Sequence, residues 1–305
     1  MLNFIEDLKY RDGISIKLGS FVLSLKRNTN INDIHGLLQK WYKKRTGKNL
    51  NLDNPKTFNE KIQWLKIYDN NPLKTKLADK YLVREWIKEQ IGEDYLIPLL
   101  GVWDNFDKID FNTLPEKFVL KANHGSHWNI IVKNKAELNP QKAKKLFDKW
   151  MQRNYAFKAG YEMQYSDIKP KIIAEQYIED SNHELNDYKI LCFNGEPEFI
   201  WVDCGRYTKN RTKNIYDINW NLQPFTMSYP ASKEDIPKPQ HLDKMLELAK
   251  KLSKTFAFVR VDFYNVDGKI YFGEMTFTSM SGVEKFSPEN YDLKIGEMLK
   301  LPNEG

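Results

Sequence analysis

Short apolar runs joined by tight turns constrain most strongly what this chain can fold into. Asn194-Gly195 is a strong hairpin signal, because Asn and Gly tolerate the positive φ that such turns need, and Asp267-Gly268 marks a second turn. The apolar runs that flank these turns cover residues 187–193 and 197–203, and residues 256–265 and 269–277. Each pair of runs is therefore predicted to form two neighbouring antiparallel strands.

Helical patterns alternate with further strands along the rest of the chain. Helices are predicted at residues 31–46, from 58 to 67, at 74–91 with Gly92 at the C-terminal end, from Asn139-Pro140 to about residue 155, and at 239–254. Further strands are predicted at residues 118–122 and 129–132, which form a hairpin, and at 171–178. Helices interspersed with hairpin-linked strands favour an α+β fold over a doubly wound parallel sheet.

The composition is that of an ordinary globular protein. Of the 305 residues, 41% are hydrophobic and 29% are charged, which excludes a disordered chain, a collagen and a membrane bundle. No apolar run approaches the roughly 18 residues of a membrane-spanning helix, and the first residues lack the basic start of a secretory signal. Cys192 and Cys204 are too few for a disulfide framework, so a reducing, cytoplasmic location is expected.

The net charge of +6 comes entirely from residues 1–50. These carry ten Lys or Arg and four acidic residues, whereas residues 51–305 are balanced. Such an excess indicates either contact with an anionic surface, such as phospholipid at the inner face of a membrane or a phosphorylated carrier, or a solvated basic helix. Nucleic acid is not expected as a partner, because neither stacking aromatics nor a zinc-finger pattern accompanies the charge.

Several common catalytic sequences are missing. The sequence contains no G-x-G, no G-x-x-x-x-G-K and no G-x-S-x-G, which excludes the dinucleotide fingerprint, the standard P-loop and the nucleophile elbow. The histidines form no H-E-x-x-H, and no cysteines are paired at zinc spacing. D-x-D is missing as well, which counts against a metal-dependent transferase of nucleotide-diphosphate sugars.

Two acids in the C-terminal pair of strands have the chemistry of a metal site. Alternate residues of a strand share a face, so Arg260 and Asp262 point to one side, as do Glu274 and Thr276. A three-residue turn at residues 267–269 would place Asp262 opposite Glu274, whereas a two-residue turn would shift the pairing by one position. The first register is favoured, with a cation such as Mg²⁺ relieving the repulsion between the carboxylates. The alternative is an exposed strand face with unpaired acids.

Two earlier segments have features of a nucleotide site. Lys121 lies in an apolar run just before the loop Asn123-His124-Gly125-Ser126, so it either needs an anionic partner or faces solvent. The backbone N–H groups of such a loop can bind a phosphate. The apolar run from Ile172 to Ile178 and the acids after it can receive an adenine and a ribose; the alternative is an ordinary core strand.

Taken in order, these segments resemble the ATP-grasp superfamily. The resemblance is carried by Asp79-Lys80 on a helix, Phe118-Val119-Leu120-Lys121, Ala174-Glu175-Gln176-Tyr177-Ile178, Arg260-Val261-Asp262 and Glu274-Met275-Thr276. The stretches Lys121-Ala122-Asn123-His124-Gly125-Ser126 and Thr57-Phe58-Asn59-Glu60-Lys61-Ile62-Gln63-Trp64-Leu65 are similar to its TupA-like branch, which is linked to bacterial capsule and other surface polysaccharides.

The resemblance extends from about residue 55 to 300 and implies an ATP-grasp fold, in which two α+β subdomains clasp a nucleotide. The implied divisions are a basic helical segment (1–55), a helical lead-in (56–115), a small subdomain (116–178) and a large subdomain with the metal-binding strands (179–305). In place of the usual N-terminal α/β domain, the chain begins with helical, basic sequence, so recognition of the acceptor is expected to differ.

The resemblance also implies roles for individual residues in binding ATP. Those expected to contact its phosphates are Lys80, Lys121 (also catalytic), His124, Gly125 and Ser126. Those expected at the adenine are Glu175, Gln176, Tyr177 and Ile178. Asp187 is expected to bind the ribose, with Glu184 as the less favoured alternative.

Metal and acceptor residues are implied in the same way. Asp262 and Glu274 are expected to hold Mg²⁺, and Arg260 is the catalytic residue that neutralises charge on the transferred phosphoryl group. Thr276 stands where the family usually has an asparagine ligand, so a second Mg²⁺ is expected to bind more weakly or through water. Four basic residues after a predicted strand either bind an acidic acceptor or form a solvated loop: Arg206, Lys209, Arg211 and Lys213.

The activity implied is ATP-dependent ligation of a carboxylate to an amine through an acyl phosphate. The expected partners are ATP, an amine and an acidic sugar or glycan acceptor, as part of surface polysaccharide biosynthesis. Two alternatives stay open. One is a glycosyltransferase of the same process, and the other is a non-catalytic nucleotide-binding scaffold that docks at a membrane through residues 1–50.

Overall fold

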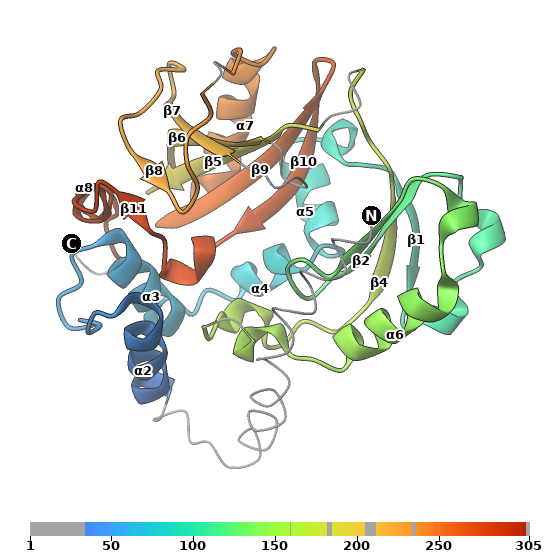
Figure 1. Ribbon diagram of the computed structural model, residues 1–305, viewed down its shortest axis with the longest axis horizontal. Helices are drawn as coiled ribbons and strands as arrows, with labels where there is room; N and C mark the ends of the chain where they lie inside the picture. Colours follow the sequence, from blue (N-terminus) through green and yellow to red (C-terminus); the bar gives the residue numbers. More distant parts are fainter. Residues whose placement is uncertain (1–33, 159, 182–184, 205–211, 234–235, 303–305) are drawn as a thin grey trace.

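Two antiparallel sheets form the framework of the protein in the computed structural model (Figure 1). The structure describes residues 34–302 except 159, 182–184, 205–211 and 234–235. Every strand pair within this part of the chain is antiparallel. Helices accompany both sheets, so the predicted α+β class is confirmed.

The strands and helices have the following bounds. The smaller sheet, ordered β1-β4-β2-β3, contains β1 (Leu99–Trp103), β2 (Phe118–Ala122), β3 (Asn129–Val132) and β4 (Ile172–Gln176). The larger sheet, ordered β10-β9-β5-β6-β7, contains β5 (Asp187–Phe193), β6 (Glu196–Cys204), β7 (Thr212–Asp217), β9 (Phe258–Val266) and β10 (Lys269–Thr276). A separate pair consists of β8 (Thr226–Met227) and β11 (Phe286–Ser287). The helices are α2 (Ile34–Thr46), α3 (Phe58–Tyr68), α4 (Leu73–Ala78), α5 (Val83–Gln90), α6 (Pro140–Met151), α7 (Leu242–Ser253) and α8 (Tyr291–Met298).

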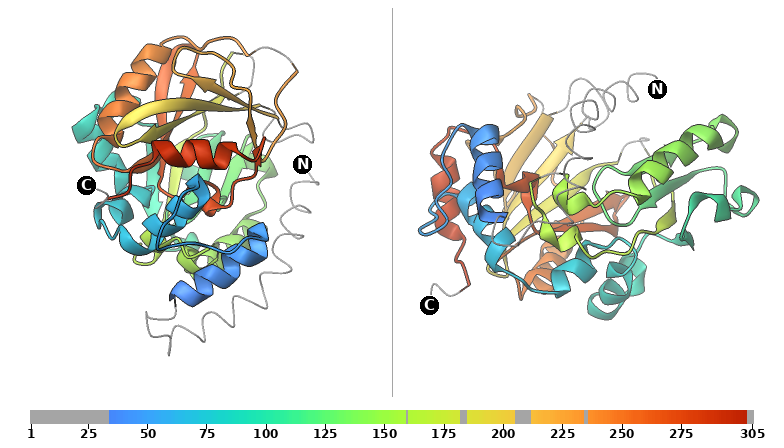
Figure 2. Two further views of the ribbon diagram at one scale, coloured as in Figure 1. Left: turned by 90° about the vertical axis from the view of Figure 1, so that its left-hand side faces the viewer. Right: turned by 90° about the horizontal axis from the view of Figure 1, so that it is seen from below.

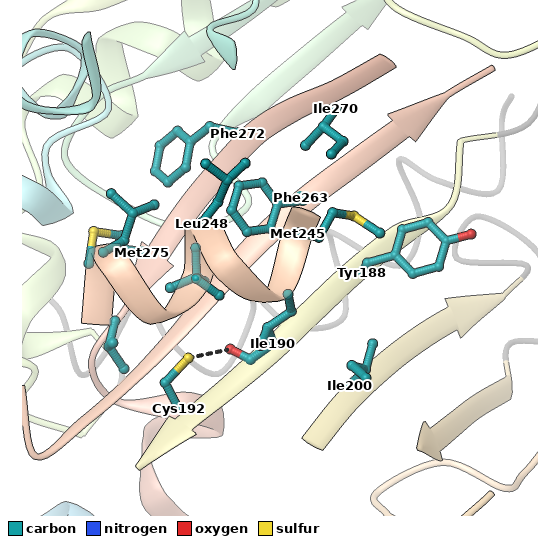
Figure 3. Close-up of a cluster of buried hydrophobic side chains, with 14 of the residues drawn as sticks. Tyr188, Ile190, Cys192, Ile200, Met245, Leu248, Phe263, Ile270, Phe272 and Met275 are labelled. Carbon is teal, nitrogen blue, oxygen red and sulfur yellow. Dashed lines mark hydrogen bonds between the residues drawn. The ribbon is translucent and has the colours of Figure 1, made fainter. Parts of the chain in front are cut away.

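Alternation along the strands of the larger sheet separates an apolar face from a charged one. Val261 and Phe263 of β9 pack with Met245 and Leu248 of α7, and Figure 3 shows the neighbouring side chains of this cluster on the same face. Arg260 and Asp262 alternate with these apolar residues and therefore point to the opposite face. The hydrophobic core beneath α7 thus fixes the side of the sheet on which the charged residues lie.

The opposite face of the larger sheet is covered in part by α3 and α8. Phe58 at the start of α3 is fully buried, and its ring centroid lies 5.1 Å from that of Phe258 and 6.0 Å from that of Phe193. The helix begins at Phe58 because Thr57 accepts from the Glu60 N–H, while the Glu60 side chain accepts from the Thr57 N–H. Figure 2 shows α2 and α3 together at the end of the molecule away from α6.

The smaller sheet is covered on one face by α6. Phe118, Leu120 and Ala122 of β2 share a hydrophobic cluster with Phe147 and Trp150 of α6. As the sequence predicted, Asn139 caps this helix, accepting from the Lys142 N–H, and Pro140 occupies its first turn. The alternate residues of β2, including Lys121, consequently point to the other face of the sheet.

The prediction of a single helix at residues 74–91 is wrong, because the chain forms two helices there, α4 and α5. Asp79 lies at the break, where its side chain accepts from the backbone N–H groups of Tyr81 and Leu82 at 2.8 and 3.2 Å. Lys80 therefore lies outside a helix, and its N–H donates to the carbonyl oxygen of Asn123. By accepting from the backbone N–H groups of Tyr81 and Leu82, the Asp79 carboxylate replaces the hydrogen bonds that a continuous helix would form here.

The α5 helix lies between the two sheets (Figure 1). Its apolar residues Val83 and Ile87 belong to the hydrophobic cluster of the larger sheet, whereas Arg84 contacts Glu175 of the smaller sheet. No helix in the described part of the chain is both long and apolar enough to span a membrane.

The turn between β9 and β10 differs from the prediction, although the residue pairing does not. Val266 pairs with Lys269, so the turn contains only Asp267 and Gly268, both at positive φ. An irregularity between Phe272 and Glu274 then adds one residue to β10, and Asp262 pairs with Glu274 after all. The predicted three-residue turn is therefore wrong, and a bulge at Gly273 restores the register.

Gly273→Ala tests the packing of this bulge. A Cβ at this position would lie 3.1 Å from the carbonyl oxygen and 3.3 Å from the Cβ of Asp262. We expect the free energy of unfolding in urea to fall by about 1–3 kcal/mol, because β9 must move to accommodate the methyl group. Lys269→Ala, on the exposed start of the same strand, should change it by less than about 0.5 kcal/mol. Equal values for the two variants would contradict the close approach.

Candidate active site

A guanidinium group joins the two predicted metal ligands. Arg260 donates from Nε and Nη2 to the two oxygens of Asp262, both at 2.7 Å, and from Nη2 to Oε1 of Glu274 at 2.9 Å. Asp262 and Glu274 face each other across β9 and β10, and Thr276 donates its hydroxyl to Glu274 at 3.3 Å. Arg260 thus supplies positive charge between the two carboxylates, where a cation such as Mg²⁺ was expected.

Lys189 is a second cation in this cluster, and the sequence analysis missed it. It lies opposite Asp262 on β5, with its ammonium 3.2 Å from the Asp262 carboxylate, and it also pairs with Asp187. A lysine at an alternate position of an apolar run is the signal that drew attention to Lys121, and it also applies to Lys189. Asp187, the predicted ribose ligand, is buried and already paired with Lys189.

Burial and charge pairing together set the pKa values of Asp262 and Arg260. Burial raises the pKa of Asp262 to about 6, although Arg260 and Lys189 both favour the carboxylate. The pKa of Arg260 is raised above its ordinary value, because the attraction of Asp262 and Glu274 outweighs the desolvation that acts in the other direction. Asp262 and Arg260 therefore form a charged pair that is largely shielded from water.

The chemistry of the donors suits a magnesium ion that also binds phosphate. Mg²⁺ commonly uses one or two carboxylates and completes its coordination with phosphate oxygens and water. Glu274 is 34% exposed, whereas Asp262 is 4% exposed, so the Glu274 end of the cluster is the accessible one. No group of three or more His, Cys, Asp or Glu residues in the described part of the chain forms a metal site from protein ligands alone. Asp262 and Glu274 therefore fit Mg²⁺ as two of its ligands, with phosphate oxygens and water as the others.

The smaller sheet brings two of the predicted residues, Lys121 and Glu175, close to the helix α5. The Lys121 ammonium lies 2.5 Å from Oε2 of Glu175, and Arg84 of α5 lies 2.9 Å from Oε1. Lys121 and Glu175 are diagonal neighbours on the adjacent strands β2 and β4. The anionic partner that Lys121 was expected to need is therefore Glu175. Arg84 had no distinguishing local pattern in the sequence.

The loop after β2 closes over Lys80. The Lys80 ammonium donates to the carbonyl oxygen of Gly125 at 2.7 Å, and Asn123 donates from its side chain to Asp79 at 2.9 Å. A Cβ on Gly125 would lie 2.5 Å from the ring of Trp128, so this loop position accepts only glycine without rearrangement. The segments Asp79-Lys80 and 123–125, which are far apart in the sequence, form one unit.

Lys80 also links the two sheets electrostatically. Burial lowers its pKa, while the Glu274 carboxylate raises it and the Lys121 ammonium lowers it further. Glu274 belongs to the larger sheet and Lys121 to the smaller one. The residues predicted to hold the metal and those predicted to hold the phosphates therefore act on the same ammonium group.

The segment predicted to contact adenine leaves β4 at its end. Glu175 is buried within the strand, Gln176 is exposed, and Tyr177 and Ile178 follow outside any strand or helix. The hydroxyl of Tyr177 donates to Glu179 at 3.2 Å, and the ammonium of Lys133 lies 5.4 Å from the Tyr177 ring centre. The tyrosine side chain thus contacts charged residues that lie just beyond the ends of β3 and β4.

Only one predicted acceptor residue falls within the described chain. Lys213 lies in β7 and has no exposed surface; its ammonium lies 3.2 Å above the Trp201 ring and 4.0 Å from Glu284. It therefore does not occupy the solvated loop that was considered. The other predicted residues outside the described part are Glu184, Arg206, Lys209 and Arg211, together with the basic stretch up to residue 33.

His124 is predicted to stay neutral over the physiological pH range. Burial lowers its pKa to about 4, with a further contribution from Lys80, and Nε2 lies 3.1 Å from the carbonyl oxygen of Trp150. Nδ1 lies 3.2 Å from the side-chain oxygen of Asn123, so the neutral ring, which carries one N–H, donates to only one of these two acceptors. We expect the His124 imidazole signals to show no protonation between pH 8 and about pH 5 in an NMR titration. A midpoint near the ordinary value of about 6.5 would contradict this.

Comparisons with known proteins identify the family of the chain. Residues 60–300 match the family model described as TupA-like ATPgrasp. No curated protein matches the chain. Among solved structures, it is similar to D-alanine–D-alanine ligase from Bacillus anthracis, with 17% identity, a TM-score of 0.42, and coverage of 73% of this chain and 65% of that one.

Similarity to other solved structures is also low in sequence identity. An L-amino acid ligase from Bacillus licheniformis has 14% identity and a TM-score of 0.46, with coverage of 79% of this chain and 55% of that one. This chain therefore spans less than two thirds of the length of these two ligases. The assignment depends on the match over residues 60–300, which covers most of the sequence. The chain belongs to the TupA-like ATP-grasp family, and the resemblance read from its sequence is confirmed.

Proposed function

We propose that the protein is an ATP- and Mg-dependent ligase that joins a carboxylate to an amine through an acyl phosphate. We further propose that its acceptor is an acidic sugar or glycan of a bacterial capsule or another surface polysaccharide, or a precursor of one. Membership of the TupA-like ATP-grasp family supports the proposal. A cytoplasmic location is part of it.

One feature carries the proposal: the Lys80 ammonium donates to the carbonyl oxygen of Gly125 at 2.7 Å, and both Glu274 and Lys121 shift its pKa. Phosphoryl transfer needs cations along the phosphate chain and carboxylates for the metal ion in the same place. The larger sheet supplies the carboxylates, and the smaller sheet supplies Lys121. Such a combination suits a triphosphate better than a substrate without phosphate.

The residues have distinct roles in this scheme. Lys80 and Lys121 bind the phosphates, and the loop of His124, Gly125 and Ser126 covers them with backbone N–H groups. Asp262 and Glu274 would hold Mg²⁺, which when bound neutralises charge on phosphate oxygens. Thr276, which donates to Glu274, orients that ligand. The residues around the end of β4, Glu175 to Ile178, receive the adenine, and Asp187 lies nearest the ribose.

The proposed chemistry has two steps. A carboxylate oxygen of the acceptor bonds to the γ-phosphorus, the bond from that phosphorus to the β-γ bridging oxygen breaks, and ADP leaves. An amine nitrogen then bonds to the acyl carbon, the carbon–oxygen bond to phosphate breaks, and the nitrogen loses a proton. In the first step, Arg260 stabilises negative charge on the transferred group. Its guanidinium lies beside Glu274, which is a proposed ligand of the metal ion at that group.

Contact with an anionic surface through residues 1–50 is a further part of the proposal. The described portion of that segment includes α2, whose last turn contains Lys43, Lys44 and Arg45, all exposed. Juxtaposed basic side chains of this kind are attracted to anionic lipids or a phosphorylated carrier. The contact would bring the enzyme to an acceptor that is bound to a membrane.

Asp262→Asn and Glu274→Gln test the metal assignment. The protein is incubated with ATP and Mg²⁺ and a panel of uronic acids and amines, and the release of ADP and phosphate is measured. Each variant should lower ADP release by about a hundredfold or more, because a charge-stabilising group is lost. Glu247→Gln, an exposed change on α7, should retain wild-type activity. Undiminished turnover in both site variants, with folding verified by urea unfolding, rejects the assignment.

The same assay separates the two alternatives. Consumption of a nucleotide sugar without ATP would support a glycosyltransferase. Binding of a non-hydrolysable ATP analogue without ADP release under any acceptor would support a scaffold. Formation of ADP and phosphate only when an acid and an amine are both present would support the ligase.

A further inference from the structure

Glu175 is a buried carboxylate that two cations share, one at each oxygen. The Lys121 ammonium is 2.5 Å from Oε2, and Nη1 of Arg84 is 2.9 Å from Oε1. The three side chains come from β4, β2 and α5. Because the Glu175 side chain is only 9% exposed, its charge depends on these partners rather than on water.

The two cations are held differently. Nη2 of Arg84 donates to the carbonyl oxygen of Ile97 at 2.7 Å, and Val83 and Ile87 fix the same helix in the core of the larger sheet. Lys121 has no comparable anchor in the hydrogen bonds of the described chain, where its ammonium donates to Glu175. A lysine ammonium is a point charge on a flexible stem, whereas an arginine guanidinium is a rigid group that can donate several hydrogen bonds at once. Arg84 is thus the fixed partner of Glu175, and Lys121 is the movable one.

A phosphate would draw Lys121 away from Glu175. The ammonium groups of Lys80 and Lys121 repel each other, as the effect of Lys121 on the Lys80 pKa indicates, and an anion between them would relieve this repulsion. Glu175 would then lose one of its two partners. If Lys121 were the sole partner, a buried and unpaired carboxylate would remain, and it would compete with the phosphate for the ammonium.

We propose that Arg84 is a positioning residue that keeps Glu175 paired while Lys121 moves from Glu175 to a nucleotide phosphate. The inference rests on the proposed function, because it requires Lys121 to bind ATP. Arg84 acts through Glu175 and does not touch the nucleotide. Loss of Arg84 should therefore weaken nucleotide binding only when residue 175 carries a negative charge.

A double-mutant cycle tests this dependence. Binding of a non-hydrolysable ATP analogue with Mg²⁺ is measured by calorimetry for the full chain, Arg84→Met, Glu175→Gln and the double variant. Arg84→Met alone should weaken binding about tenfold to a hundredfold. In the Glu175→Gln background the same change should alter the affinity by less than about threefold, because no buried carboxylate then competes for Lys121.

Two further variants control for an effect of the Arg84 substitution on folding. Lys88→Met, on an exposed position of the same helix, should bind the analogue as the wild type does. Arg84→Lys keeps a cation and should fall between the wild type and Arg84→Met. If Arg84→Met does not unfold cooperatively in urea, the cycle is measured with Arg84→Lys instead, and a smaller non-additivity of the same sign is expected.

Each result has a definite meaning. Equal weakening in the charged and the neutral Glu175 backgrounds assigns Arg84 a merely structural role and overturns the proposal. Unchanged binding in folded Arg84→Met also overturns it. If the wild-type protein does not bind the analogue, it is the proposed function that fails, and with it the premise of the inference.

Discussion

The structure depends on pairing the carboxylates that lie inside a sheet with cations. Asp262 and Glu274 face each other across a hairpin, where two negative charges would repel and lose their hydration. Arg260 resolves this by donating to both side chains, and Lys189 adds a second positive charge beside Asp262. With the hydrophobic core on the opposite face, this pairing fixes which side of the larger sheet carries charge.

The smaller sheet uses a related arrangement with a different outcome. Glu175 is buried between Lys121 and Arg84, so a phosphate can compete for one cation while the other stays. The break between α4 and α5 places Lys80 beside the loop at Gly125 rather than on a helix surface. Within the described chain the two sheets share no strand pairing, but the charges of Glu274 and Lys121 both act on Lys80.

Several parts of the fold could be predicted from local pattern. The hairpins at Asn194-Gly195 and Asp267-Gly268 follow from turn chemistry, and the start of α6 follows from Asn139 and Pro140. Strand β1 was missed because a run of five apolar residues does not distinguish a strand from a helix. Strand β7 was missed because its buried Lys213 and Asn214 interrupt the apolar pattern.

The sequence by itself determined the antiparallel character of the sheets, the chemical types at the candidate site and the family to which the chain belongs. Tertiary structure decided which of those types meet. The register of Asp262 and Glu274 depends on a bulge at Gly273, and the helix break depends on Asp79 capping the turn after it. Arg84 and Lys189 gain their roles only when distant segments pack. A buried charge is stabilised by the partner that packs beside it, and that partner comes from another part of the chain.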